Sequence, residues 1–266
     1  TDGRGRRFFL GFSPGAQTVH VFDDSWQLLL TYPDADREHA GIQDAVLADL
    51  NQDGDLELFV GFGGIVGIHA VRMDGVRIWS YRGETPVLSL ATVSSRNERV
   101  LLATGESGKI QRIDASGTPL PPVTVGQRMI HHVFPSRSGV VRPTQLCGLV
   151  TATDGRLMAV GLTPTAKELW TYPLPLGTYT QPVRMVVSGH FFANSEWDWI
   201  FVGPDGSIHF VSDDGRQHDT FRVGSPVYGV ASETSRDETR LIVSSSEGVA
   251  AYRVEPYPED HLPAAE

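Results

Sequence analysis

Four acidic side chains and one asparagine crowd into the stretch "DLNQDGDLE" at residues 49–57. They are Asp49, Asn51, Asp53, Asp55 and Glu57. They fall on alternate positions, and Gly54 in the sixth place permits the sharp bend of a tight loop. Carboxylate, amide and backbone oxygens are the ligands that calcium takes in proteins. Because the carboxylates would repel one another, the stretch predicts a bound Ca2+ that neutralises them, and a solvated acidic turn is the alternative.

The residues that follow the loop decide what kind of calcium site is expected. The first six residues fit the start of an EF-hand loop, which carries Glu in its twelfth place and lies between two helices. The twelfth place here is Val60, inside the apolar stretch "ELFVGF". The loop therefore connects two strands. A loop that binds the ion through its own oxygens leaves few open positions, so we expect a structural ion and not a catalytic one.

The apolar stretch after the loop belongs to an internal repeat. Six similar stretches recur at intervals of about 40 to 50 residues, a period typical of propeller blades. They are "RFFLGF" (7–12), "ELFVGF" (57–62), "VLLATG" (100–105), "LCGLVT" (146–151), "WIFVGP" (199–204) and "RLIVSS" (240–245). Most units continue with a second strand, a tight turn, a third strand and a last strand.

Four short antiparallel strands per unit predict an all-β fold, a β-propeller of six or possibly seven blades. A stack of β-sandwiches is the competing interpretation. The first unit lacks its leading strand and the last lacks its outer strand. We expect a propeller domain over 1–254, with units near 1–41, 42–85, 86–127, 128–181, 182–225 and 226–254. The acidic, Pro-rich segment 255–266 is expected to be a flexible tail.

The acidic loop followed by an apolar strand that ends in Gly61 resembles the FG-GAP or VCBS repeat of integrin-α-type propellers. The resemblance implies side-chain ligands Asp49, Asn51, Asp53 and Glu57, together with the backbone carbonyl of Asp55. The sequence departs from the family pattern at Glu57, where the family has Asp. The other units have lost the motif, and "TDGRGRR" keeps only Asp2 and Gly3.

The stretches "RIWSYR" and "ELWTYP" resemble the W-x-Y strands of quinoprotein-type propeller repeats. That resemblance implies that Trp79 and Trp170 pack between neighbouring blades. It does not lead us to expect pyrroloquinoline quinone, because such sites usually have a vicinal disulfide and the chain has one cysteine, Cys147.

Two further tryptophans, Trp197 and Trp199, stand at the corner of the fifth unit. On a strand they share one face. One interpretation is a platform on which a sugar or peptide ligand stacks. The other is packing at the corner of the blade.

Composition narrows the class of function. The formal charge of −10 argues against a nucleic-acid-binding protein, and no apolar run is long enough to span a membrane. We therefore expect a non-catalytic, calcium-stabilised module that binds a protein or carbohydrate ligand. A calcium site of this kind suits an extracellular, periplasmic or cell-surface location. The alternative is a polysaccharide lyase or hydrolase with its active site at the mouth of the propeller channel.

Overall fold

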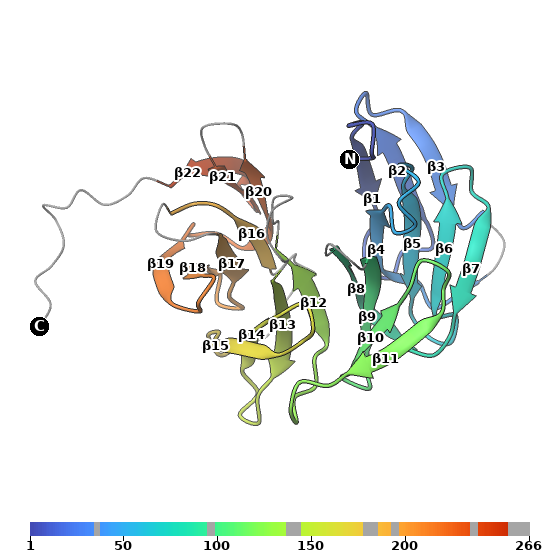
Figure 1. The fold of residues 1–266 in the computed structure, drawn as a ribbon. Coiled ribbons are helices and arrows are strands. Elements are labelled where there is room, and N and C mark those ends of the chain that lie inside the picture. The colour runs from blue at the N-terminus through green and yellow to red at the C-terminus, as the bar shows by residue number, and fades with distance from the viewer. Residues whose placement is uncertain are drawn as a thin grey trace, which may run out of the picture. The chain divides into compact units, whose positions relative to one another are not determined.

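The computed structural model describes residues 1–34, 38–94, 99–136, 145–177, 186–192, 197–234 and 239–254. Every regular element in these ranges is a β-strand, and the strands form six antiparallel sheets. The predicted all-β class and the six propeller blades are confirmed (Figure 1). The expected tail at 255–266 lies outside the described residues.

The first two sheets contain the N-terminal segment and the acidic loop. Strands in each sheet pair in chain order. The first sheet has β1 (Phe8–Gly11), β2 (Val19–Asp23) and β3 (Leu28–Tyr32). The second has β4 (Ile42–Ala48), β5 (Glu57–Phe62), β6 (Ile68–Arg72) and β7 (Arg77–Tyr81). As expected, the first sheet has one strand fewer than the second.

The remaining sheets repeat the same order. The third sheet has β8 (Val87–Ser94), β9 (Arg99–Gly105), β10 (Ile110–Ile113) and β11 (Pro119–Val123). The fourth has β12 (His132–Pro135), β13 (Leu146–Thr151), β14 (Leu157–Leu162) and β15 (Glu168–Pro173). The fifth has β16 (Val186–Gly189), β17 (Asp198–Val202), β18 (Ser207–Ser212) and β19 (Gln217–Arg222). The sixth has β20 (Val227–Thr234), β21 (Thr239–Ser245) and β22 (Gly248–Arg253).

The chain forms two compact units. Unit 1 comprises Thr1–Pro135 and Val140–Leu169, and unit 2 comprises Ser136–Gly139 and Trp170–Glu266. In unit 1, apolar side chains of the first and second sheets pack together, as do those of the second with the third and of the third with the fourth. In unit 2 the fifth and sixth sheets share a core. Each unit thus consists of sheets stacked face to face around buried aliphatic and aromatic side chains.

A tight turn leads from the last strand but one of a sheet to its outer strand, and the third residue of this turn has a left-handed backbone conformation. This residue is Trp26, Gly75, Gly117, Ala166 or Gly215 in the first five sheets. In the second, third and fifth sheets, the outer strand of the preceding sheet lies over this turn. The ring of Trp79 lies 2.7 Å from the point that a Cβ on Gly117 would occupy, and its Nε1 donates to the carbonyl of Ala115 at 3.0 Å.

Trp170 makes the same contacts inside unit 2. Its ring lies 2.7 Å from the point that a Cβ on Gly215 would occupy, and its Nε1 donates to the carbonyl of Asp213 at 2.8 Å. Both tryptophans therefore pack between neighbouring sheets, as the W-x-Y resemblance implies. Glycine is required in these two turns because a Cβ would collide with the indole and would also strain the backbone.

The strands β11 and β12 were not predicted from the sequence. Three of the five residues of β11 are prolines, Pro119, Pro121 and Pro122, which lack the N–H that a central strand needs. The sheet tolerates them because β11 is its outer strand and pairs on one side only.

Candidate functional site

The acidic loop joins β4 to β5, and the paired residues Ala48 and Glu57 close it. The prediction of a strand-to-strand connection is therefore confirmed. Gln52 and Gly54 have left-handed backbone conformations, with φ of 65° and 91°, so the chain turns sharply twice within the loop. These bends bring alternate side chains back toward the backbone of the same loop.

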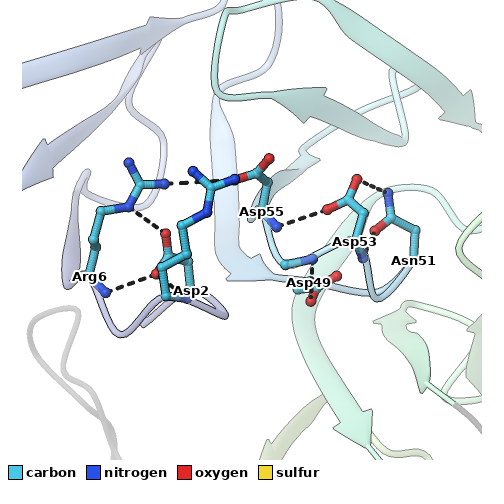
Figure 2. A network of polar contacts seen from close by, with 8 residues as sticks. Asp2, Arg6, Asp49, Asn51, Asp53 and Asp55 are labelled. Carbon is cyan, nitrogen blue, oxygen red and sulfur yellow. Dashed lines mark hydrogen bonds and ion pairs between the residues drawn. The ribbon is translucent and has the colours of Figure 1, made fainter.

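Hydrogen bonds within the loop hold the expected ligands close together (Figure 2). Asn51 Oδ1 accepts from the N–H of Asp53 at 3.0 Å, and Asp53 Oδ1 accepts from the N–H of Asp55 at 2.8 Å. Asp49 Oδ2 accepts from the N–H of Gly54 at 3.2 Å. The amide of Asn51 also donates to Asp53 Oδ2 at 2.9 Å. The side chains of Asp49, Asn51 and Asp53, three of the five predicted residues, are thus arranged around one bend.

Glu57 is the fifth predicted ligand, and it is buried, with 6% of its surface exposed. Its Oε2 accepts from the N–H of Leu50 at 3.2 Å. Burial raises the pKa of the Glu57 carboxyl, and repulsion from Asp53, Asp49 and Asp55 raises it further, while the bond from Leu50 acts in the opposite direction. Ionised Glu57 is therefore electrostatically unfavourable in this loop.

Three arginines face the loop, and none was identified as part of the site from the sequence. Arg99, at the start of β9, donates through Nη1 to the carbonyl of Asp49 at 2.6 Å, and Nη1 lies 3.4 Å from Asp49 Oδ2. Arg4 and Arg6 lie near Asp55, with Nη2–Oδ1 distances of 3.5 and 3.7 Å. They come from segments far from the loop in sequence, so residue spacing gave no signal for them.

The N-terminal segment packs directly on the loop (Figure 2). The N–H of Gly3 donates to the carbonyl of Gly54 at 3.0 Å, and a Cβ on Gly3 would lie 2.9 Å from Gly54 Cα. The Asp2 side chain accepts from the N–H groups of Arg4 and Arg6 and, at 2.6 Å, from Arg6 Nε. Burial alone would raise the pKa of Asp2, but these bonds outweigh it and lower the pKa. The motif remnant Asp2–Gly3 thus anchors the segment against the loop.

One oxygen of the loop lacks a partner. Asp49 Oδ1 is buried and accepts no hydrogen bond. A buried carboxylate oxygen without a partner is unfavourable. A cation at this oxygen would remove that cost, and the neighbouring oxygens of Asn51, Asp53 and Glu57 are of the type that calcium prefers. The chemistry of the donor set therefore fits a hard divalent cation.

The side chains do not form a ready ligand cage. Over the described parts of the chain, no three His, Cys, Asp or Glu side chains are grouped so that they could hold a metal ion. The reason lies in the bonds above, which turn the oxygens of Asn51, Asp53 and Glu57 onto backbone N–H groups. Small side-chain rotations within the loop would be needed for these oxygens to converge.

The fifth sheet shows how the corresponding corner is built without the acidic motif. Asp198, fully buried at the start of β17, accepts through Oδ2 from the N–H groups of Phe191 and Phe192 at 2.8 and 3.0 Å. His218 Nδ1 lies 3.4 Å from Asp198 Oδ1 and forms an ion pair when protonated. Among the described residues of this corner, the Asp198 carboxylate caps two backbone N–H groups.

Of the two interpretations of Trp197 and Trp199, the structure favours packing at the corner of the blade. Trp199 has no exposed surface, and Trp197 is 9% exposed. The rings of Trp199 and Trp170 lie edge to face with centroids 6.5 Å apart. A ligand has no ring face on which to stack at this corner, so packing is the correct interpretation.

Comparison with solved structures supports the fold. A chain of the crystal structure of BBS1N in complex with ARL6DN, soaked with lead, matches with a TM-score of 0.63 and 14% identity, over 96% of this chain and 79% of that chain. The mercury-soaked crystal of the same complex matches with a TM-score of 0.62 and 14% identity, over 96% and 75%. BamB from Moraxella catarrhalis matches with a TM-score of 0.48 and 16% identity, over 89% and 78%.

The two similarities with TM-scores above 0.6 show the fold alone. No protein-family model matches the sequence, and no curated protein matches it. Membership of the FG-GAP or VCBS family is therefore not shown. No helix in the described ranges is long and apolar enough to cross a membrane.

Proposed function

We propose that this chain is a calcium-stabilised β-propeller that serves as a protein-binding scaffold outside the cytoplasm. The observation that carries the proposal is the imbalance of charge at the acidic loop. Asp2, Asp49, Asp53, Asp55 and Glu57 are five carboxylates, and Arg4, Arg6 and Arg99 are three guanidinium groups, which leaves a net charge of −2 when all are ionised. One divalent cation balances that charge.

The residues that would hold the ion are the predicted ones. Side-chain oxygens of Asp49, Asn51, Asp53 and Glu57 and the backbone carbonyl of Asp55 supply the oxygen-rich environment that calcium needs. The bound ion would supply a positive charge that stabilises ionised Glu57 and gives Asp49 Oδ1 a partner. A loop site with few rigid ligands suits the millimolar calcium found outside cells, which supports an extracellular, periplasmic or cell-surface location.

The binding role is supported by the fold and by charge. A chain of the crystal structure of BBS1N in complex with ARL6DN has a similar fold, and that structure is a complex of two proteins. The net charge of −10 favours partners with a basic surface, because opposite potentials steer association. Fold does not fix the partner, so the identity of the ligand has to come from individual surface features.

Thermal unfolding tests the calcium proposal. We expect millimolar Ca2+ to raise the melting temperature of the parent protein relative to EDTA, because a ligand that binds only the native state stabilises it. Asp53→Ala should abolish this calcium effect. Asp74→Ala is the matched control, because Asp74 also accepts a backbone N–H within a turn of the same sheet. Its variant should keep the calcium effect even if it melts earlier.

A parent protein that melts at the same temperature in calcium and in EDTA would overturn the metal assignment. Loss of the calcium effect in Asp74→Ala as well would show that the response is not specific to the loop.

A further inference from the structure

Five polar side chains in unit 2 form an unbroken chain of hydrogen bonds. Ser207 Oγ lies 2.5 Å from Asp205 Oδ1 and 2.6 Å from His209 Nε2. Tyr172 Oη lies 2.8 Å from His209 Nδ1 and donates to Gln217 Oε1 at 2.5 Å. Tyr172 belongs to β15, whereas the other four residues belong to β18, β19 and the turn before β18. We call these five residues the His209 relay.

The middle of the relay is shielded from water. Tyr172 and His209 are each 8% exposed, and Ser207 is 5% exposed. The two ends, Asp205 and Gln217, are exposed. Buried polar atoms are costly without partners, so each of the four contacts along the relay needs one proton between its two atoms.

The protons that the side chains carry decide which state of His209 completes the relay. Ser207, Tyr172 and a neutral His209 supply one proton each, which leaves one of the four contacts without a proton. Asp205 does not supply it. Burial alone would raise the pKa of Asp205, but bonds from Ser207 and Arg222 outweigh it and lower the pKa. The observed arrangement is therefore complete only when His209 is an imidazolium that donates through both ring nitrogens.

A half-turn of the Gln217 amide completes the relay with neutral His209 as well. Gln217 Nε2 then donates to Tyr172 Oη, and the tyrosine hydroxyl donates to His209 Nδ1. The single proton of His209 stays on Nε2, where it donates to Ser207. Because Gln217 is exposed, its amide is free to turn. Protonation of His209 at Nδ1 thus reverses two hydrogen bonds and breaks none.

The corresponding pair in unit 1 lacks this freedom. Tyr32 Oη lies 2.9 Å from His69 Nδ1. Arg77 starts the outer strand β7, as Gln217 starts β19, and it hydrogen-bonds Tyr32. A guanidinium group only donates, so the Tyr32 hydroxyl must donate to His69 Nδ1, and protonation of His69 would break their bond. Burial and the charge of Arg77 accordingly lower the pKa of His69 to about 4.

Charged and titratable groups approach His209 from each element packed against it. They are Tyr172 from β15, Asp205 from the turn before β18 and Arg222 at the end of β19. Arg222 also pairs with Asp205. Burial lowers the pKa of His209, Asp205 opposes this effect and Arg222 adds to it. We propose that the His209 relay is a pH-sensitive element that keeps β15 bonded to the fifth sheet in both protonation states of His209.

Nuclear magnetic resonance of the full chain with isotope-labelled histidine tests the proposal, because each ring nitrogen reports separately whether it carries a proton. His209→Gln identifies the signals of His209. At neutral pH we expect the proton of His209 on Nε2, and at acidic pH a second proton on Nδ1. His209 should titrate below pH 6.5 and at a higher pH than His69, because only His209 keeps all its bonds when protonated.

Gln217→Met removes the acceptor for Tyr172 without adding a charge. The imidazolium state then leaves the Tyr172 hydroxyl without a partner, so His209 should titrate about one pH unit lower than in the parent. Arg77→Gln gives unit 1 the residue that the relay has, and it should raise the pH at which His69 titrates by about one unit. Gln27→Met is the matched control, because Gln27 is also exposed and stands beside an outer strand, β3. It should leave the titration of His209 unchanged.

Three results would overturn the proposal. They are a neutral His209 with its proton on Nδ1, a His209 that stays neutral at every pH at which the protein is folded, and the same titration of His209 in the parent and in Gln217→Met. The first two are measured on the parent protein, so they decide the proposal even if a variant fails to fold. None of these measurements needs calcium, so the outcome is independent of the metal assignment.

Discussion

At the scale of single residues, Glu57 shows most clearly what the acidic loop requires. It combines burial with three carboxylate neighbours, and both raise its pKa. A carboxyl group whose pKa is raised by folding makes the native state less stable wherever the group is ionised in both states. The loop thus carries a local penalty near neutral pH that a bound cation would remove.

Glu57→Gln should therefore have opposite effects without and with calcium. In EDTA near pH 7 we expect the free energy of unfolding to rise by about 0.5–1 kcal/mol, allowing for solvent screening, because glutamine keeps the acceptor for Leu50 but no charge. The gain should vanish as pH falls through the raised pKa of Glu57 toward the usual 4.5, where the parent carboxyl is protonated. In calcium the variant should be less stable than the parent, because a ligand is lost.

Urea unfolding of parent and variant at both pH values, with EDTA and with calcium, measures these differences. A variant that is less stable than the parent in EDTA near pH 7 would show that Glu57 is not under electrostatic strain.

Sequence spacing could predict that the proposed ligand residues lie together, because their geometry is local. Asp49, Asn51 and Asp53 lie within one bend, and the bend follows from the left-handed backbone at Gly54. Spacing could not predict Arg4, Arg6 or Arg99, which approach the loop through the packing of distant segments. It also left two interpretations of Trp197 and Trp199 open, because a strand pattern shows which side chains share a face but not whether that face is covered.

At the scale of elements, the turn before each outer strand is a repeated device that locks neighbouring sheets together. Gly117 has a φ of 85°, and the ring of Trp79 lies in its Cβ direction. Gly155 has nearly the same φ, 83°, but no atom lies within 4 Å of the Cβ position. The two glycines therefore differ in packing and share the same backbone requirement.

Gly117→Ala should be more destabilising than Gly155→Ala by about 1–3 kcal/mol, because both variants strain the backbone and only the first displaces a packed indole. Denaturant midpoints of the two variants measure the difference. Equal losses of stability would show that the contact between Trp79 and the turn contributes little.

Two tyrosine–histidine pairs join sheets in the same way. Tyr32 Oη lies 2.9 Å from His69 Nδ1 in unit 1, and Tyr172 Oη lies 2.8 Å from His209 Nδ1 in unit 2. Burial lowers the pKa of His69 from 6.5 to about 4, and nearby Arg77, Arg82 and His39 act in the same direction. Burial also lowers the pKa of His209, although Asp205 opposes it.

As pH falls, the unfolded chain takes up a proton at His69 at a higher pH than the folded chain does. The stability contributed by neutral His69 is therefore present above pH 6.5 and is lost as pH falls to about 4. His69→Gln should remove this pH-dependent contribution to stability. Over that pH range the free energy of unfolding of the parent should therefore fall by roughly 1–2 kcal/mol more than that of the variant, after a discount for screening. Parallel pH-dependent urea titrations measure it, and identical pH profiles would contradict it.

The repeat made most strands predictable, because each unit carries the same alternation of apolar residues and turns. It did not make β11 predictable, because its three prolines resemble a loop until the neighbouring β10 supplies a partner. The tertiary position of an outer strand, which pairs on one side, decides what its sequence can tolerate.

At the scale of the whole molecule, the period of the repeat predicts the six-sheet architecture. It does not identify the protein family. The chain matches two solved structures with TM-scores of 0.62 and 0.63 at 14% identity. This match shows a common fold and does not show a common function. The division into two compact units adds information that the repeat did not contain. The acidic loop, the N-terminal segment and Arg99 all belong to unit 1.

Hydrogen exchange should show that division when calcium is added. A ligand that binds the native state slows those opening reactions that disrupt its site. We expect Ca2+ to slow amide exchange in β4, β5, the N-terminal segment and the start of β9, because they contact the loop. Exchange in β17 and β18 of unit 2 should stay unchanged. Asp53→Ala, the control, should show no calcium effect in either unit. Slower exchange in β17 and β18 alone would mean that calcium acts at another site, whereas slower exchange confined to unit 1 would support the acidic loop as the place where it binds.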